Sequence, residues 1–126
     1  MKISYTMRLR KYFTSIFDAE GIESYYFRAD KKAGFEYLTF ELREIGSTLD
    51  SPNGRRFLLE INLWGRRNRD SLEILADKIM FILQSHTGNA DGYFVSTYPA
   101  YDRLNIDEGG EINRIRLSFE VRYYTC

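Results

Sequence analysis

Side chains that commonly carry catalysis or bind metals are sparse in this chain, and their spacing forms no known catalytic pattern. His86 is the only histidine and Cys126 is the only cysteine. His86 falls near the expected end of a helix, where the negative end of the helix dipole favours it without any catalytic role. Zinc or iron would need carboxylate ligands as well, and no carboxylate spacing suggests them. We therefore predict no catalytic residue, no metal site and no cofactor.

An acidic cluster near the C-terminus comes closest to a cation site. Asp102, Asp107, Glu108 and Glu111 lack the alternating ligand order of a calcium-binding loop, so a solvated turn explains them better. The serines lack the context of a nucleophile elbow, and no glycine-rich phosphate-binding loop occurs. The sequence thus predicts a protein that is not an enzyme.

Five arginines bracket one predicted strand, namely Arg55 and Arg56 at its start and Arg66, Arg67 and Arg69 after its end. Arginines can bind phosphates or pair with a partner's carboxylates, and a solvated strand end explains them equally well. Eighteen basic residues balance eighteen acidic ones, so bulk charge favours neither nucleic acid nor an anionic membrane. A nucleic-acid-binding module that uses the arginine-rich turn is the alternative function, although no specific nucleic-acid binding is expected.

The elements that position these arginines lie between Arg55 and Gly88. Hydrophobicity alternates over residues 57–64, which predicts a strand with one buried face. Asp70 is a predicted helix N-cap with Glu73 completing a capping box, and Gly88 is the predicted stop. Apolar residues between them recur at helical spacing. The buried strand face comprises Phe57, Leu59, Ile61 and Leu63, and the buried helix face comprises Leu72, Leu75, Ala76, Ile79, Met80 and Leu83.

Three large apolar residues are not explained by this core. Ile74 and Phe81 lie seven residues apart on another stripe of the same helix, and Trp64 lies on the strand face opposite Leu63. A surface helix of a monomer rarely needs a second large apolar stripe. The pattern therefore favours self-association through these residues.

The rest of the chain supplies the other elements of one domain, residues 1–126. A helix is predicted from Ser4 to Glu20, ended by Gly21, and a polar loop from Gly46 to Gly54. Strands are predicted at 36–44, 93–98 and 114–124, with a short edge strand at 25–27 and a continuation of the third strand over 101–106 beyond Pro99. The predicted fold class is α+β, with an about four-stranded, mainly antiparallel sheet and two helices packed on one face. No apolar stretch suits a signal peptide or a membrane span, so a soluble protein made inside the cell is expected.

The order of these elements resembles the tail-terminator (tail-completion) proteins of long-tailed bacteriophages and prophages. Three segments carry the resemblance, which covers most of the chain. The first is the N-terminal helix ending at Gly21, and the second is residues 56–65 (RFLLEINLWG) running into a helix with LADKI at its centre. The third is residues 106–124, in which the acidic turn IDEGG precedes INRIRLSFEVRYY.

The resemblance implies a structural virion protein, often called a minor tail protein, at the head-proximal end of the tail. Such proteins form a ring, usually a hexamer, that caps the tail tube, stops its elongation and joins it to the head connector. The implied partners are other copies of the chain, the tail-tube protein and the head-completion or connector protein, with assembly in the host cytoplasm. A closed ring needs a heterologous interface. The predicted interface residues are Trp64, Ile74 and Phe81, with Arg55, Arg56, Arg66, Arg67 and Arg69 at their polar rim.

Overall fold

The computed structural model describes residues 4–34, 36–48, 53–66, 69–90, 92–107 and 112–125. The helices within these ranges are α1 (Tyr5–Ala19) and α2 (Arg69–Leu83). The strands are β1 (Ser24–Tyr26), β2 (Glu36–Ser47), β3 (Gly54–Gly65), β4 (Thr87–Ala90), β5 (Tyr93–Asp107) and β6 (Asn113–Thr125).

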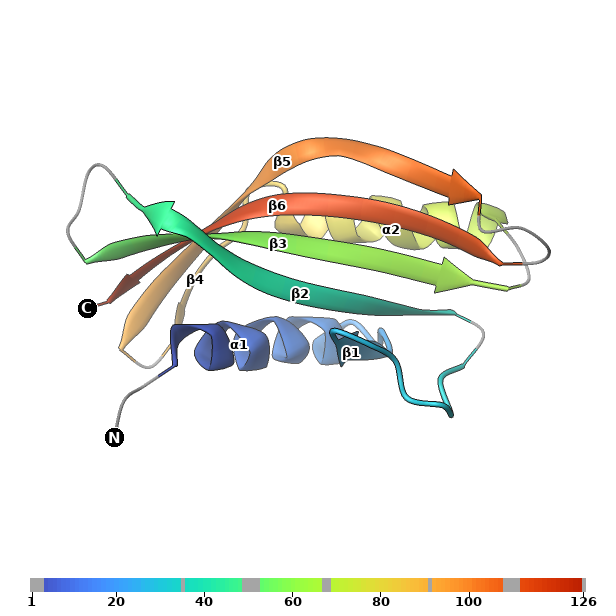
Figure 1. Cartoon of the computed structure of the whole chain (residues 1–126), viewed down its shortest axis with the longest axis horizontal. Coiled ribbons are helices and arrows are strands. Elements are labelled where there is room, and N and C mark those ends of the chain that lie inside the picture. Colours follow the sequence, from blue (N-terminus) through green and yellow to red (C-terminus); the bar gives the residue numbers. More distant parts are fainter. Residues whose placement is uncertain are drawn as a thin grey trace.

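These strands form one mixed sheet in the order β1-β2-β3-β6-β5-β4, and Figure 1 shows it curling into a half-barrel. β1 pairs with β2 in parallel, whereas all other neighbouring strands are antiparallel. The prediction of about four mainly antiparallel strands is therefore wrong, since the described residues form six strands with a parallel pair. Both helices pack on the same face of this larger sheet, α1 against β1 and β2 and α2 against β3, β6 and β5.

Both edge strands are too short to show a hydrophobic period; the short strand predicted at 25–27 is present one residue earlier as β1, whereas β4 was not predicted. β1 has three residues, and β4 is the run Thr-Gly-Asn-Ala. The predicted helix stop at Gly88 is also wrong, because α2 ends at Leu83 and Gly88 pairs with Val95 inside the β4–β5 hairpin. Gly92 makes the tight turn of that hairpin, with a positive φ of 83° that favours glycine.

The predicted alternation over residues 57–64 is confirmed. The inward residues of β3 are fully buried and meet the inward residues of β2 and β6 at the register Leu38↔Leu63 and Ile61↔Leu117. Leu9, Phe13 and Phe17 of α1 and Leu72, Ala76, Ile79 and Leu83 of α2 close the core over this face. The described buried side chains make one hydrophobic cluster, so both helices depend on the same sheet face.

The helix ends agree with the sequence at α1 and differ at α2. Gly21 has φ 70°, and the next N–H, from Ile22, donates to the Phe17 carbonyl at 2.9 Å, so the predicted glycine stop is confirmed. α2 begins at Arg69, which places Asp70 inside the first turn rather than at the N-cap. Its carboxylate still lies near the positive end of the helix dipole.

The strand ends also differ from the prediction. β2 extends to Ser47, so the predicted loop from Gly46 to Gly54 is shorter than expected, and residues 49–52 lie outside the described residues. β5 runs on through Pro99 to Asp107, so the predicted continuation over 101–106 is confirmed as part of the same strand. β4 pairs only with residues 93–96, so Pro99 lies in an edge portion of β5, at an irregularity in its pairing with β6. An edge tolerates the missing N–H of proline.

Candidate functional site

The outward surface of α2 carries an exposed apolar and acidic row. The side chains of Ile74 and Phe81 are 69% and 79% exposed. Asp70 and Asp77 fall on the same side of the helix, because the spacing of the four residues repeats every three or four positions. Asp77 accepts a hydrogen bond from Arg103 of β5 at 2.6 Å. We call Asp70, Ile74, Asp77 and Phe81 the helix stripe.

Trp64 lies on the opposite side of the molecule from the helix stripe. Its indole Nε1 donates to Thr39 Oγ1 at 3.1 Å, and its ring stacks on Tyr37 with centroids 6.5 Å apart. The Arg114 guanidinium lies 4.9 Å from the ring centroid of the Trp64 indole. These contacts leave Trp64 partly buried on the sheet face that the helices do not cover, which we call the open face.

The five predicted rim arginines do not come together. Arg55 points to the helix side, where it pairs with Glu44 at 3.2 Å and lies 4.5 Å from the Tyr5 ring centroid. Arg56 points to the open face, Arg66 is exposed beyond the other end of β3, and Arg69 pairs with Glu73 at 3.8 Å. Arg67 lies outside the described residues. β3 is about 37 Å long, so its two ends cannot form one patch.

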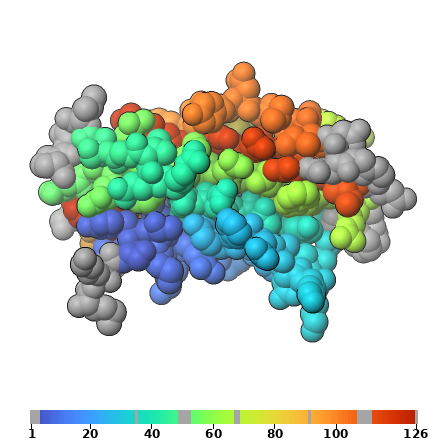
Figure 2. Space-filling model, in the orientation of Figure 1, coloured from blue at the N-terminus to red at the C-terminus, as the bar shows by residue number. Residues whose placement is uncertain are grey.

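The open face contains a groove that the sequence analysis did not identify. Three adjoining hollows of about 440, 340 and 250 Å³ run along β3, and Leu58 lines all of them. We call this continuous depression the sheet groove. Figure 2 shows one face of the molecule, on which residues of β2 (teal), β3 (green), β6 (red) and β5 (orange) lie next to one another. The groove lining also includes Glu41, Arg43, Ile45, Arg56, Glu60, Tyr98, Tyr101, Asp102, Arg103, Leu104, Arg116, Glu120 and Arg122.

Ion pairs organise the charges of the sheet groove. Glu120 accepts hydrogen bonds from Arg56 at 2.7 Å and from Arg122 at 2.9 Å. The hydrogen bond from Arg56, with a further one from Arg122, lowers the pKa of the Glu120 carboxyl. Arg116 and Glu60 form a looser pair at 3.6 Å. The one sequence signal for this groove was Leu58, an apolar residue at an outward position of β3.

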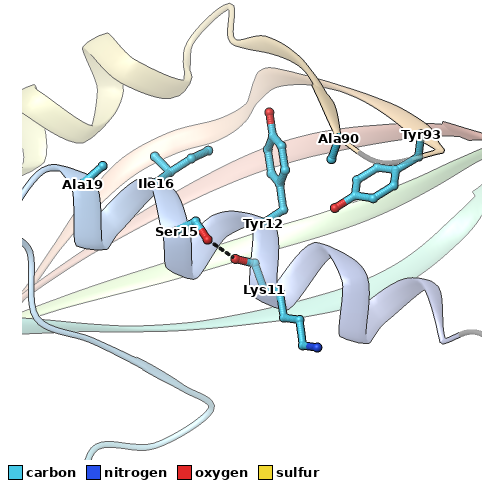
Figure 3. Close-up of a pocket in the computed structure, with 7 residues that line it drawn as sticks. All are labelled: Lys11, Tyr12, Ser15, Ile16, Ala19, Ala90 and Tyr93. Carbon is cyan, nitrogen blue, oxygen red and sulfur yellow. Dashed lines mark hydrogen bonds between the residues drawn. The ribbon is translucent and has the colours of Figure 1, made fainter.

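A second pocket, of about 390 Å³, lies between α1 and the β4–β5 hairpin. Figure 3 shows its lining, with Tyr12 extending from α1 toward the hairpin that carries Ala90 and Tyr93. The Tyr12 hydroxyl lies 2.5 Å from His86 Nε2. Partial burial raises the pKa of Tyr12 and lowers the pKa of His86, so both groups are favoured in their neutral forms. The two side chains satisfy each other's hydrogen bond and belong to no potential metal-binding group among the described residues, which fits a structural contact.

The described residues contain no group of three or more histidines, cysteines or acidic residues placed to hold a metal ion. No helix within the same residues is long and apolar enough to span a membrane. Comparison with models of protein families finds no match, and comparison with curated proteins finds no significantly similar sequence.

Proposed function

We propose that this chain is a ring-forming structural protein of a bacteriophage tail, similar to tail terminators. In this proposal the ring caps the tail tube, stops its elongation and joins it to the head connector. The protein would act through its surfaces rather than through a catalytic site. Its place would be the head-proximal end of the virion tail, after assembly in the host cytoplasm.

The exposed apolar side chains of α2 are the observation that carries the proposal. Covering a side chain the size of Ile74 or Phe81 contributes about 1.5–3 kcal/mol, and here both lie open to solvent on a well-packed helix. Nine large apolar side chains are exposed among the described residues, and six of them lie in the helix stripe or along the sheet groove. Because exposed apolar patches mark interaction surfaces, this concentration on two surfaces supports a protein that binds other protein chains through them.

The nucleic-acid-binding alternative has less support. Arg55, Arg56 and Arg69 each face a carboxylate, and phosphate binding would have to compete with these pairs. The chain also carries no net positive charge.

Tube assembly in vitro tests the proposed function. The tube-forming protein encoded in the same genome would be polymerised with and without this chain, and tube lengths and ends would be examined by electron microscopy. We expect shorter tubes with a ring at one end, at substoichiometric amounts of this chain. Undecorated tubes of unchanged length would refute the proposal. Retained DNA or RNA at low salt, lost steeply as salt rises, would favour the alternative.

A further inference from the structure

We propose that the helix stripe of one subunit docks into the sheet groove of the next subunit. This inference rests on the proposed function in one respect, namely that the chain associates with copies of itself. It goes further by naming the two surfaces that meet and the direction of the assembly.

The two surfaces face away from each other across the sheet and approach at the edge strand β5, where Arg103 lines the groove and also pairs with Asp77 of the helix stripe. α2 packs with its inner side on the buried face of the sheet, so the helix stripe points away from the sheet. The sheet groove is formed by the outward residues of β3 and its neighbours, on the face that the helices leave open. Contact between different patches on opposite sides of the sheet propagates head to tail, and it closes into a ring when the rotation between subunits allows.

The dimensions of the two surfaces match. The helix stripe extends about 16 Å from Asp70 to Phe81, given the rise of an α-helix. The groove floor extends about 14 Å along β3 from Arg56 to Glu60. Leu58 lies midway along this floor, where an apolar side chain of the helix would be covered.

The chemistry of the two surfaces is complementary. The helix stripe alternates acidic and apolar residues and carries two negative charges. Of the residues lining the groove, five are arginines and four are acidic, but Arg103 already pairs with Asp77 of its own subunit, and the other eight charges cancel. Arg43 forms no ion pair among the described residues, so it can bind a carboxylate of the neighbouring helix stripe. Exposed apolar side chains border it at Ile45, Tyr98, Tyr101 and Leu104. Asp77 stays 73% exposed beside Arg103, so a second arginine from the neighbouring subunit can reach its carboxylate.

Two variants with damage on one surface each provide the test. Phe81→Lys places a positive charge in the helix stripe and leaves the groove intact. Tyr101→Glu places a negative charge in the groove and leaves the helix stripe intact. Both residues are strongly exposed, at 79% and 70%, so neither change removes core packing. Met7→Lys is the matched control, because Met7 is a 52% exposed apolar residue on α1, away from both surfaces.

Sedimentation velocity would measure the association of each protein at concentrations up to about 1 mM. We expect wild type and Met7→Lys to form oligomers, and each single variant to associate more than about tenfold more weakly. A mixture of the two variants should recover association, because Tyr101→Glu still offers an intact helix stripe and Phe81→Lys still offers an intact groove. Circular dichroism would show that all variants keep the wild-type fold.

Three outcomes overturn the inference: single variants that assemble like wild type, a mixture that remains monomeric, or a wild type that stays monomeric over the whole range. A mixture that stays monomeric although both variants have lost association would indicate a contact between identical surfaces. Tube capping by wild type in the assembly assay would leave the proposed function standing after any of these results. Failure of tube capping, together with association restored in the mixture, would reject the tail function and keep the interface.

Discussion

Replacing Gly88 with alanine tests whether glycine is needed there to end a helix or to leave room for the Tyr12 side chain. If Gly88 ended a helix, alanine would be strained by the backbone alone, whatever the nearby side chains were. In the structure Gly88 lies in β4 without a positive φ, and an added Cβ would overlap the Tyr12 hydroxyl. The same Cβ would come within 3.2 Å of His86 Nε2 and 3.3 Å of Tyr12 Cζ. The cost should therefore depend on Tyr12.

The magnitude follows from three contributions. Overpacking costs about 1–3 kcal/mol, displacement of Tyr12 loses a hydrogen bond worth about 1 kcal/mol, and removal of a strand glycine returns about 0.5–1 kcal/mol. We expect Gly88→Ala to lower the free energy of unfolding by about 2 kcal/mol. Tyr12→Phe alone should cost about 1 kcal/mol, through the lost bond to His86. In the Tyr12→Phe background the overlap with the hydroxyl is gone, so Gly88→Ala should then cost less than about 0.5 kcal/mol.

Urea unfolding of the four proteins of this double-mutant cycle measures the coupling, and thermal unfolding should show a drop of about 8 °C for Gly88→Ala alone. Gly92→Ala is the control. Its φ of 83° strains alanine although nothing lies within 4 Å of the added Cβ, so its cost of about 1 kcal/mol should be the same with or without Tyr12. Additive effects of Gly88→Ala and Tyr12→Phe, or a neutral Gly88→Ala, would show that the Tyr12 side chain is not what restricts position 88.

Two further predictions concern the core and the single histidine. Leu117 is 1% exposed, so Leu117→Ala should lower the free energy of unfolding by about 2–5 kcal/mol in a urea titration. Ile74 lies on the exposed helix stripe, so the free energy of unfolding of Ile74→Ala should stay within about 0.5 kcal/mol of wild type in the same titration. Partial burial lowers the pKa of His86, so below its ordinary pKa of about 6.5 the unfolded chain binds the extra proton more readily than the folded chain. The contribution of His86 to the free energy of unfolding should thus be complete above pH 6.5, roughly the ordinary pKa, and should fall as the pH drops toward the pKa of the folded state. The difference between the wild-type and His86→Gln profiles of unfolding free energy against pH isolates this contribution. A difference profile that is flat, or that rises toward acid, would contradict this sign.

The parts of the fold that depend on local periodicity can be predicted from the sequence. Alternation over residues 57–64 and 114–124 reports which side chains face the core, because successive side chains of a strand point to opposite faces. Gly21 was identifiable for a similar reason, since a residue with positive φ at a helix end favours glycine. Ile74, Phe81 and Trp64 were also recognisable as residues outside the core, because the same periods that define the buried face define its opposite.

How distant segments meet depends on long-range packing, which local patterns do not reveal. β4 is a strand because β5 pairs with it, which no period in four residues can indicate, and the short strand predicted near β1 gave no sign of its parallel pairing with β2. Gly88 looked like a helix stop because its true constraint, the Tyr12 side chain, comes from a residue 76 positions earlier in the chain. The five arginines were grouped by their closeness in sequence, yet the alternation of β3 sends Arg55 and Arg56 to opposite faces and its length separates both from Arg66. The sheet groove depends on the register of β2, β3, β6 and β5, which long-range packing sets, and so it could not be predicted from any one of these strands alone.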